Sequence, residues 1–424
     1  MKRIFLLILF LSVTSCKYLD LNVRSDGTVE PISYIDTGKL EDNQENNKLK
    51  IALLFPFSGR AERIGDMMFK AAQLSMFNHR ISNVELLPFD TKGTDFGAVD
   101  AINSAIRSEA DVIVGPFSTQ ETEAVIDIAK ANNIIVMSVS DNQNLITKNR
   151  PNLYLLGLTP QQEIDRLISY LIDKQNFYAF SALLPSSIYG SSVSQDFTNV
   201  IRKKDAKIIK REFYTPNDQR LFLKTTELLG SVSYRDEAYK RYEQEKEVAR
   251  RENLKLKVEF QYTEDDKIYT DGLLIPDSGV NLQRIGKFYD SYMGNKKPVL
   301  IGTSKWLNNN LYNDVNFENA YFTSPDPLNY VNFQNNFFDV FGVYPLRISS
   351  LVYDAITSLI ESYAAAQDKE NIKYALENYQ GFDGINGKFR YLHTGMLERK
   401  LCIMKIEKGK YNIVDYDDNP FLEY

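Results

Sequence analysis

Short, almost wholly apolar runs alternate with longer amphipathic stretches from residue 51 onward. The run IALLFPF (51–57) precedes ERIGDMMFKAAQLSMF (62–77), and DVIVGPF (111–117) precedes TQETEAVIDIAKANN (119–133). Strands that are buried on both faces are apolar at every position, whereas helices that cover a sheet are apolar on one side only. The pattern therefore predicts an α/β fold in which helices cover both faces of a parallel sheet.

A second set of the same units begins further along the chain. The stretch TPQQEIDRLISYLIDKQN (159–176) opens with Thr159-Pro160, a pair that suits a helix cap and first turn, and the apolar run FYAFSALLPS (177–186) follows it. With 424 residues, of which 43% are hydrophobic, the chain has the length and the apolar content for two packed bodies. We therefore expect two doubly wound lobes, each with its own parallel sheet.

The first sixteen residues have the pattern of an export signal. Two basic residues precede an apolar run at 4–13 that is too short to span a bilayer, and small residues precede Cys16, as in the lipobox of bacterial lipoproteins. We expect 1–16 to be a lipoprotein signal peptide with Cys16 as the lipidated residue; after an ordinary signal peptide, Cys16 would be an unmodified thiol. The polar residues 17–48 then form a tether, and the lipid alone attaches the chain to its membrane.

Charge narrows the choice of partners. The formal net charge is −6 at pH 7, and no dense stripe of lysine and arginine occurs. Such a chain is a poor binder of nucleic acid and of anionic lipid. Its partners are expected to be proteins or small solutes, with no nucleic acid among them.

Residues that carry catalytic chemistry are sparse. His79 and His393 are the only histidines and are isolated from each other, and the chain has no zinc-like Cys/His cluster, phosphate-binding glycine loop or G-x-S-x-G elbow. Cys402 lies in an apolar run and is expected to be a small buried residue. We therefore expect no enzyme, no metal site and no cofactor.

A highly charged stretch interrupts the alternation at about 233–258. Twelve of the eighteen residues from Arg235 to Glu252 are charged, and several opposite charges are spaced four residues apart. This composition predicts a solvated helix with a narrow apolar stripe. Both a plain surface insertion and a helix that docks a partner fit the pattern.

The segments 51–59, 64–76, 110–142 and 188–201 resemble type I periplasmic-binding-protein domains of the branched-chain amino-acid receptor class. Four later segments are similar to one branch of that class, the penicillin-binding-protein activator family: 271–292 (DGLLIPDSGVNLQRIGKFYDSY), 298–306, 333–363 and 382–406 (FDGINGKFRYLHTGMLERKLCIMKI). The resemblance depends on ordered segments along the chain rather than on one motif.

The resemblance covers nearly all of 49–415 and implies that the chain passes three times between the lobes through a hinge. It implies an N-terminal lobe of 49–158 plus 325–380 and a second lobe of 159–324 plus 381–424, with a crevice between them. Ligands of doubly wound sheets bind beyond the carboxyl ends of the strands.

Several candidate ligand-binding residues follow the predicted strands. Ser58, Ser118 and the pair Ser140 and Asn142 each come directly after an apolar run. The resemblance implies that Ser118, Ser140 and Asn142 bind a ligand carboxylate and that Tyr189 faces the crevice from the second lobe. Structural roles compete with these assignments, because Ser118 can open a capping box, Asn142 fits a turn, and Tyr189 stands where a helix starts.

Ser304 is a candidate for a different reason. The amino-acid receptors hold the ligand ammonium with an acidic residue near this position, where the chain has Ser304 and Lys305. A buried ammonium without a carboxylate is poorly compensated, which weighs against an amino-acid ligand.

Two functions follow from the resemblance. The first is a lipid-anchored periplasmic protein that contacts a peptidoglycan synthase, a penicillin-binding protein, and stimulates it from the inner leaflet of the outer membrane, with the inner membrane left open. The second is a receptor for an amino acid or amide that serves a transporter or a sensor.

Overall fold

The computed structural model describes residues 48–417 and residue 421, apart from 81–82, 148–149, 230, 234, 253–266, 293–296 and 309. The expected signal peptide, Cys16 and nearly all of the expected tether lie outside the described residues. Within the described part of the chain, no helix is both long enough and apolar enough to cross a bilayer.

Five parallel strands form the first sheet, in the order β2-β1-β3-β4-β5. The first apolar run forms β1 (Leu49–Phe55), where Leu53 lies opposite Val114 of β3. The sheet has a switch point between β1 and β3, because the chain builds β2 on one side of β1 and then crosses to the other. The remaining strands are β2 (Val84–Asp90), β3 (Val112–Val114), β4 (Ile135–Ser138) and β5 (Leu153–Leu155).

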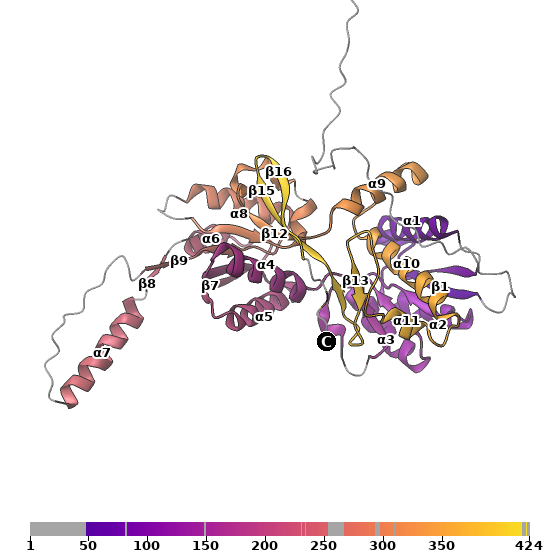
Figure 1. The fold of residues 1–424 in the computed structure, drawn as a ribbon, viewed down its shortest axis with the longest axis horizontal. Coiled ribbons are helices and arrows are strands. Elements are labelled where there is room, and N and C mark those ends of the chain that lie inside the picture. Colours follow the sequence, from indigo (N-terminus) through magenta and orange to yellow (C-terminus); the bar gives the residue numbers. More distant parts are fainter. Residues whose placement is uncertain are drawn as a thin grey trace, which may run out of the picture. The chain divides into compact units, whose positions relative to one another are not determined.

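Helices cover both faces of this sheet (Figure 1). On β1, Leu53 packs in a core with side chains of α1 and α10, whereas Leu54 packs on the opposite face with side chains of α2 and α3. This alternation is the ordinary period of a strand that is buried on both sides. The helices are α1 (Glu62–His79), α2 (Asp95–Arg107), α3 (Thr119–Ala131), α9 (Leu328–Phe341), α10 (Ser349–Ala366) and α11 (Ile372–Leu376).

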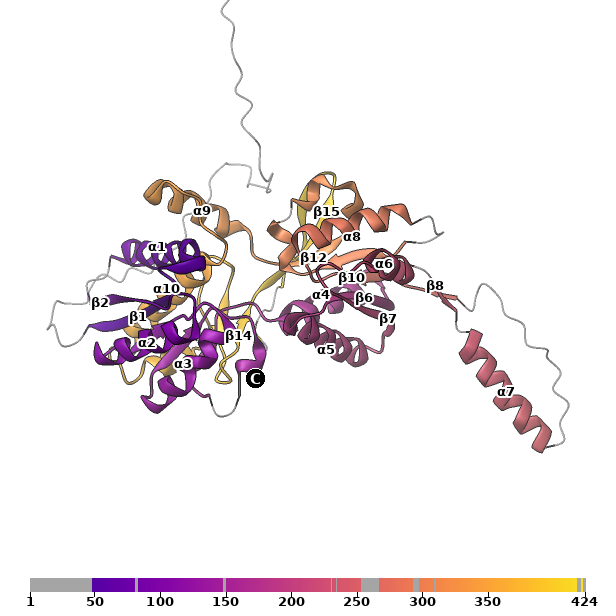
Figure 2. The same ribbon diagram turned by 180° about the vertical axis from the view of Figure 1, so that it is seen from behind.

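The second sheet has seven strands in the order β16-β15-β12-β11-β10-β6-β7. Helices again lie on both faces (Figure 2), which confirms the prediction of two α/β lobes with parallel sheets. The strands are β6 (Ala179–Pro185), β7 (Lys207–Tyr214), β10 (Gly272–Leu274), β11 (Val299–Gly302), β12 (Tyr321–Pro325), β15 (Leu401–Glu407) and β16 (Lys410–Asp415); the helices are α4 (Pro160–Gln175), α5 (Ile188–Lys203), α6 (Leu221–Leu229) and α8 (Gly279–Ser291).

The last two strands depart from the parallel pattern. β15 runs antiparallel to β12, and β16 runs antiparallel to β15. The turn between β15 and β16 consists of Lys408 and Gly409, which both have positive φ values, 54° and 70°. A two-residue turn of this kind matches the twist of a hairpin, so the chain returns along its own edge instead of crossing the sheet. Cys402 is buried in β15, as expected.

The charged stretch forms α7 (Arg235–Arg251), so the predicted helix is confirmed over these residues. It is flanked by β8 (Ser231–Ser233) and β9 (Lys267–Tyr269), which pair antiparallel and bring both ends of the insertion together. Arg251 and Glu247 form an exposed ion pair with a 2.6 Å distance between their charged atoms.

The segment after α11 differs from the lobe bounds expected from sequence. Phe382, Phe389 and Tyr391 pack in the core of the first sheet, and the Tyr391 ring lies 5.5 Å from that of Tyr154 on β5. The strands β13 (Phe389–Tyr391) and β14 (Leu397–Arg399) form a hairpin here. The sequence assigns everything from 381 onward to the second lobe, whereas the aromatic contacts keep 382–397 with the first.

Candidate ligand-binding site

A cavity of about 550 Å³ lies at the carboxyl ends of strands from both sheets. This is the position where doubly wound sheets bind ligands. Its walls come from the loops after β3, β4 and β5, from the starts of α4 and α5, from the loop after β11, and from the segments around 325, 347 and 386. The lining residues are Phe117, Ser118, Thr119, Gln120, Val139, Ser140, Asp141, Gly157, Leu158, Glu163, Tyr189, Ser304, Lys305, Pro325, Arg347, Ile348, Leu351 and Asn386.

The N-terminus of α3 forms one wall. Ser118 is its cap: the backbone N–H of Glu121 donates to Ser118 Oγ at 3.2 Å, and the backbone N–H of Ser118 donates to Glu121 Oε2 at 3.0 Å. The first-turn N–H groups of Thr119 and Gln120 have no partner inside the helix. The Ser140 hydroxyl lies 2.9 Å from that of Thr119, so hydroxyl and N–H donors converge on this wall.

A second wall is built around a buried carboxyl group. Glu163, in the first turn of α4, accepts hydrogen bonds at Oε1 from the Ser304 backbone N–H at 2.6 Å and from Thr323 Oγ1 at 3.0 Å. Burial raises the pKa of Glu163, although these hydrogen bonds oppose the shift. Tyr189 lies beside it, with its hydroxyl 3.2 Å from Thr303 Oγ1.

Charged side chains of both signs line the cavity. Lys305 Nζ lies 4.2 Å from the centre of the Tyr189 ring, a cation–π contact. Asp141 follows β4, and Arg347 precedes α10. No acidic residue stands at Ser304 and Lys305, where the resemblance implies a partner for a ligand ammonium, whereas Asp141 and Glu163 line the cavity.

Comparisons with known proteins agree with this geometry. Residues 48–221 match the family model described as periplasmic binding protein. The leucine binding protein LivK of Thermotoga maritima is 16% identical, with 88% of this chain and 99% of that chain covered and a TM-score of 0.60. The substrate-binding protein LivJ of Streptococcus pneumoniae, solved in complex with isoleucine, is 17% identical, with 87% and 99% covered and a TM-score of 0.58. The chain has the type I periplasmic-binding-protein fold.

A curated relative extends the likeness at the level of sequence. An uncharacterised protein of Rickettsia prowazekii is 22% identical over 379 residues, which are 88% of this chain and 91% of that protein. The fold itself is matched over 87–88% of this chain by the solved structures of LivK and LivJ.

This fold brings four of the six predicted ligand residues together. Ser118, Ser140, Tyr189 and Ser304 line the cavity. Ser58 does not, because its hydroxyl donates to Asp90 Oδ2 at 2.6 Å and turns toward β2, on the other side of β1 from the switch point.

Asn142 also lies outside the cavity lining. Its side-chain oxygen accepts a hydrogen bond from the backbone N–H of Asn144 at 3.2 Å and caps the short helix Gln143–Leu145. The turn role that the sequence allows for Asn142 is the one that the structure shows.

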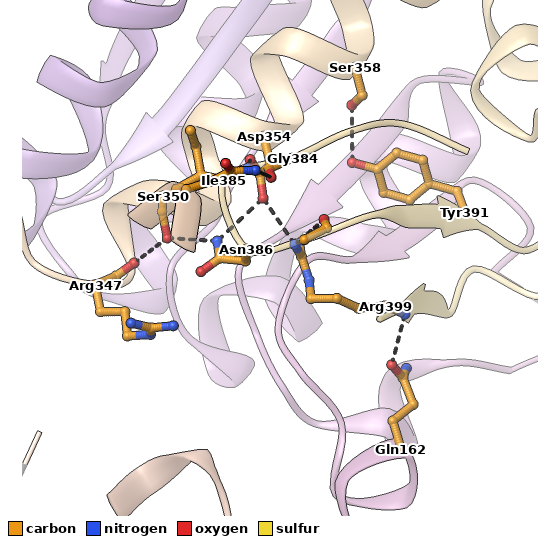
Figure 3. Close-up of polar contacts among 12 residues, drawn as sticks. Gln162, Arg347, Ser350, Asp354, Ser358, Gly384, Ile385, Asn386, Tyr391 and Arg399 are labelled. Atoms are coloured by element: carbon orange, nitrogen blue, oxygen red, sulfur yellow. Dashed lines mark hydrogen bonds and ion pairs between the residues drawn. The ribbon is translucent and has the colours of Figure 1, made fainter. Parts of the chain in front are cut away.

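A buried polar network adjoins the cavity through Asn386, which is one of the lining residues (Figure 3). Asp354 on α10 and Arg399 on β14 form an ion pair of 3.1 Å, and each side chain is only 2% exposed. The backbone N–H of Ile385 donates to Asp354 Oδ1 at 2.6 Å, and Asn386 Nδ2 donates to Ser350 Oγ at 2.7 Å. The network therefore holds Asn386 at the cavity wall.

The same network reaches α4 of the second lobe. The backbone N–H of Arg399 donates to Gln162 Oε1 at 3.2 Å, and Gln162 Nε2 donates to the carbonyl of Leu397. Gln162 is next to Glu163, so α4 is tied both to the hairpin and to the cavity. No local sequence pattern reveals this network, because its members are separated by up to 237 residues.

Within the described residues, no group of three or more histidine, cysteine or acidic side chains is arranged to hold a metal ion. His79 Nδ1 lies 2.8 Å from the carbonyl of Ser75, one turn earlier in α1.

Proposed function

We propose that this chain is a periplasmic solute-binding protein that holds a small carboxylate-bearing solute, an amino acid above all, in the cavity between its two sheets. The observation that carries the proposal is the cavity of about 550 Å³ at the strand ends, with converging donors on one wall and carboxyl groups on others. Sites for small molecules are concave and present a few placed polar groups in this way.

The carboxylate of the solute belongs at the N-terminus of α3. The first-turn N–H groups of Thr119 and Gln120 and the Ser140 hydroxyl are donors, and a helix N-terminus favours negative charge. Ser118 has a smaller part, because its N–H and hydroxyl both contact Glu121. The leucine- and isoleucine-binding neighbours support a ligand of this chemistry.

The ammonium group of an amino acid belongs near Asp141. Asp141 follows β4 directly after Ser140, so one loop offers a donor to a carboxylate and a charge to an ammonium. Glu163 is less suited to pair with a cation, because burial raises its pKa and disfavours its charged form.

We expect amino acids to raise the thermal unfolding midpoint of the lipid-free chain, since a ligand at 100 times its Kd stabilises the native state by about 2.7 kcal/mol. The double variant Ser140→Ala with Asp141→Asn should lose this stabilisation. Differential scanning fluorimetry with single amino acids, amides and short peptides measures the effect.

The matched control for that experiment is Ser58→Ala, which removes the same hydroxyl at another strand end, outside the cavity lining. It should respond to ligands as the wild type does. If no compound shifts the wild type, or if the double variant responds unchanged, solute binding in this cavity is refuted.

The second candidate is the activation of a peptidoglycan synthase by a body that Cys16 anchors to the inner leaflet of the outer membrane. The similarity of 271–292 and 382–406 to penicillin-binding-protein activators supports it. Under this alternative, residues 49–424 added to a purified synthase should accelerate glycan polymerisation, and replacing Arg235–Glu252 by a Gly/Ser linker tests α7 as the docking element. An unchanged polymerisation rate contradicts the alternative.

A further inference from the structure

Arg347 is a cavity-lining cation that lies just before α10. Its guanidinium carbon lies 4.3 Å from the centre of the Tyr330 ring of α9. This cation–π contact helps to orient the guanidinium group. Its main chain is tied to the polar network of Figure 3, because Ser350 Oγ donates to the Arg347 carbonyl at 2.7 Å. The side chain is thus held in place at the cavity wall.

The charge of Arg347 is uncompensated in the described part of the chain. Its Nη2 atom is buried and has no hydrogen-bond partner, and no described carboxylate forms an ion pair with it. Burial lowers the pKa of Arg347, and the positive charge of Arg399 lowers it further. Arginine stays protonated because its ordinary pKa is far above neutrality, so the cost of an unpaired, partly buried cation remains.

We propose that Arg347 is a second anion-binding subsite, separate from the N-terminus of α3, and that the ligand carries two anionic groups, as an acidic amino acid or a dicarboxylate does. The inference depends on the proposed function for the first carboxylate. A second carboxylate at Arg347 supplies both the missing acceptor for Nη2 and the missing counter-charge, in the paired geometry that guanidinium and carboxylate favour.

The subsite also implies discrimination against neutral side chains. A ligand such as leucine or isoleucine would leave the buried Nη2 atom of Arg347 without a partner in the complex, and sites whose buried polar groups lose their partner reject the wrong ligand strongly. The ligand specificity inferred for this chain therefore differs from that of the leucine-binding protein LivK and of LivJ in its complex with isoleucine.

The test compares ligands that differ in one charge. Calorimetric titration of the wild type with glutamate and glutamine, succinate and butyrate, and O-phosphoserine and serine should show at least one pair in which the doubly anionic member binds 10-fold tighter or more. The pair with the largest ratio of affinities shows whether the second anionic group is a carboxylate or a phosphate. Arg347→Met should reduce that ratio to about 1, and Arg347→Lys should keep part of it. Arg107→Met, which removes an exposed guanidinium on α2, is the matched control.

A stability measurement separates the subsite from a structural role. Without ligand, Arg347→Met should leave the urea unfolding midpoint unchanged or raise it, because the substitution removes an unpaired, partly buried charge. A clear fall in the midpoint, or equal ratios in wild type and Arg347→Met, overturns the subsite. Equal affinities of the wild type for charged and neutral members overturn the subsite and leave the solute-binding function standing, whereas no binding of any of these acids overturns both.

Discussion

Replacing Asp354 by alanine should lower the free energy of unfolding by about 3–5 kcal/mol, the usual cost of leaving one partner of a buried ion pair alone. The carboxylate accepts hydrogen bonds from Arg399 and from the Ile385 backbone N–H, and the Asp354 and Arg399 side chains are each 2% exposed. Without Asp354, the guanidinium of Arg399 keeps its charge and loses its counter-ion. Urea unfolding followed by circular dichroism measures the change.

Two further variants serve as controls for that experiment. The double variant Asp354→Leu with Arg399→Met should recover most of the lost stability, because apolar residues of similar volume replace both charges. Glu247→Ala breaks the exposed pair with Arg251, whose partners are 64% and 76% exposed, and should cost less than about 1 kcal/mol. A loss below about 1 kcal/mol for Asp354→Ala would mean that this network does not hold the hairpin to α10.

Trp306→Ala should destabilise the second lobe by about 3–5 kcal/mol. The indole is fully buried, its Nε1–H donates to the Ile275 carbonyl at 2.9 Å, and the Phe317 ring packs edge-on at 5.3 Å. Removing it leaves a cavity and an acceptor without its donor. The fit is close: a Cβ on Gly302 would lie 2.0 Å from the indole ring.

The measurement is again urea unfolding by circular dichroism, because Trp306 is the single tryptophan of the chain and its removal abolishes the fluorescence signal. Trp306→Phe keeps most of the ring contacts and should lose clearly less stability than the alanine variant. Equal losses in the two variants would contradict the packing explanation and assign the effect to the Ile275 hydrogen bond. A variant that stays folded should also bind ligand more weakly, because Trp306 supports the turn that carries Ser304 and Lys305.

Local patterns were enough to predict the elements that build the site. β1 is apolar on both faces and α1 is apolar on one, because each must bury those residues against the same core. Ser118 and Glu121 of the capping box are three positions apart, and Asn142 and Asn144 of the turn are two positions apart, so both are visible in the sequence. Ser140 is a candidate because it follows a predicted strand, whereas Tyr189 is a candidate only through the family resemblance.

Only the tertiary structure decided which charges meet. Asp141, Glu163 and Arg347 are separated by as many as 206 positions and share no local pattern, because the strand order and the crossings between lobes bring them to one cavity. The same holds for residues 382–397, which the resemblance assigns to the second lobe and which the contact of Tyr391 with Tyr154 assigns to the first core. By itself, the sequence determined the elements and their layers, since burial leaves a periodic record in a single segment. The composition of the site depends on contacts between distant segments, which leave no such record.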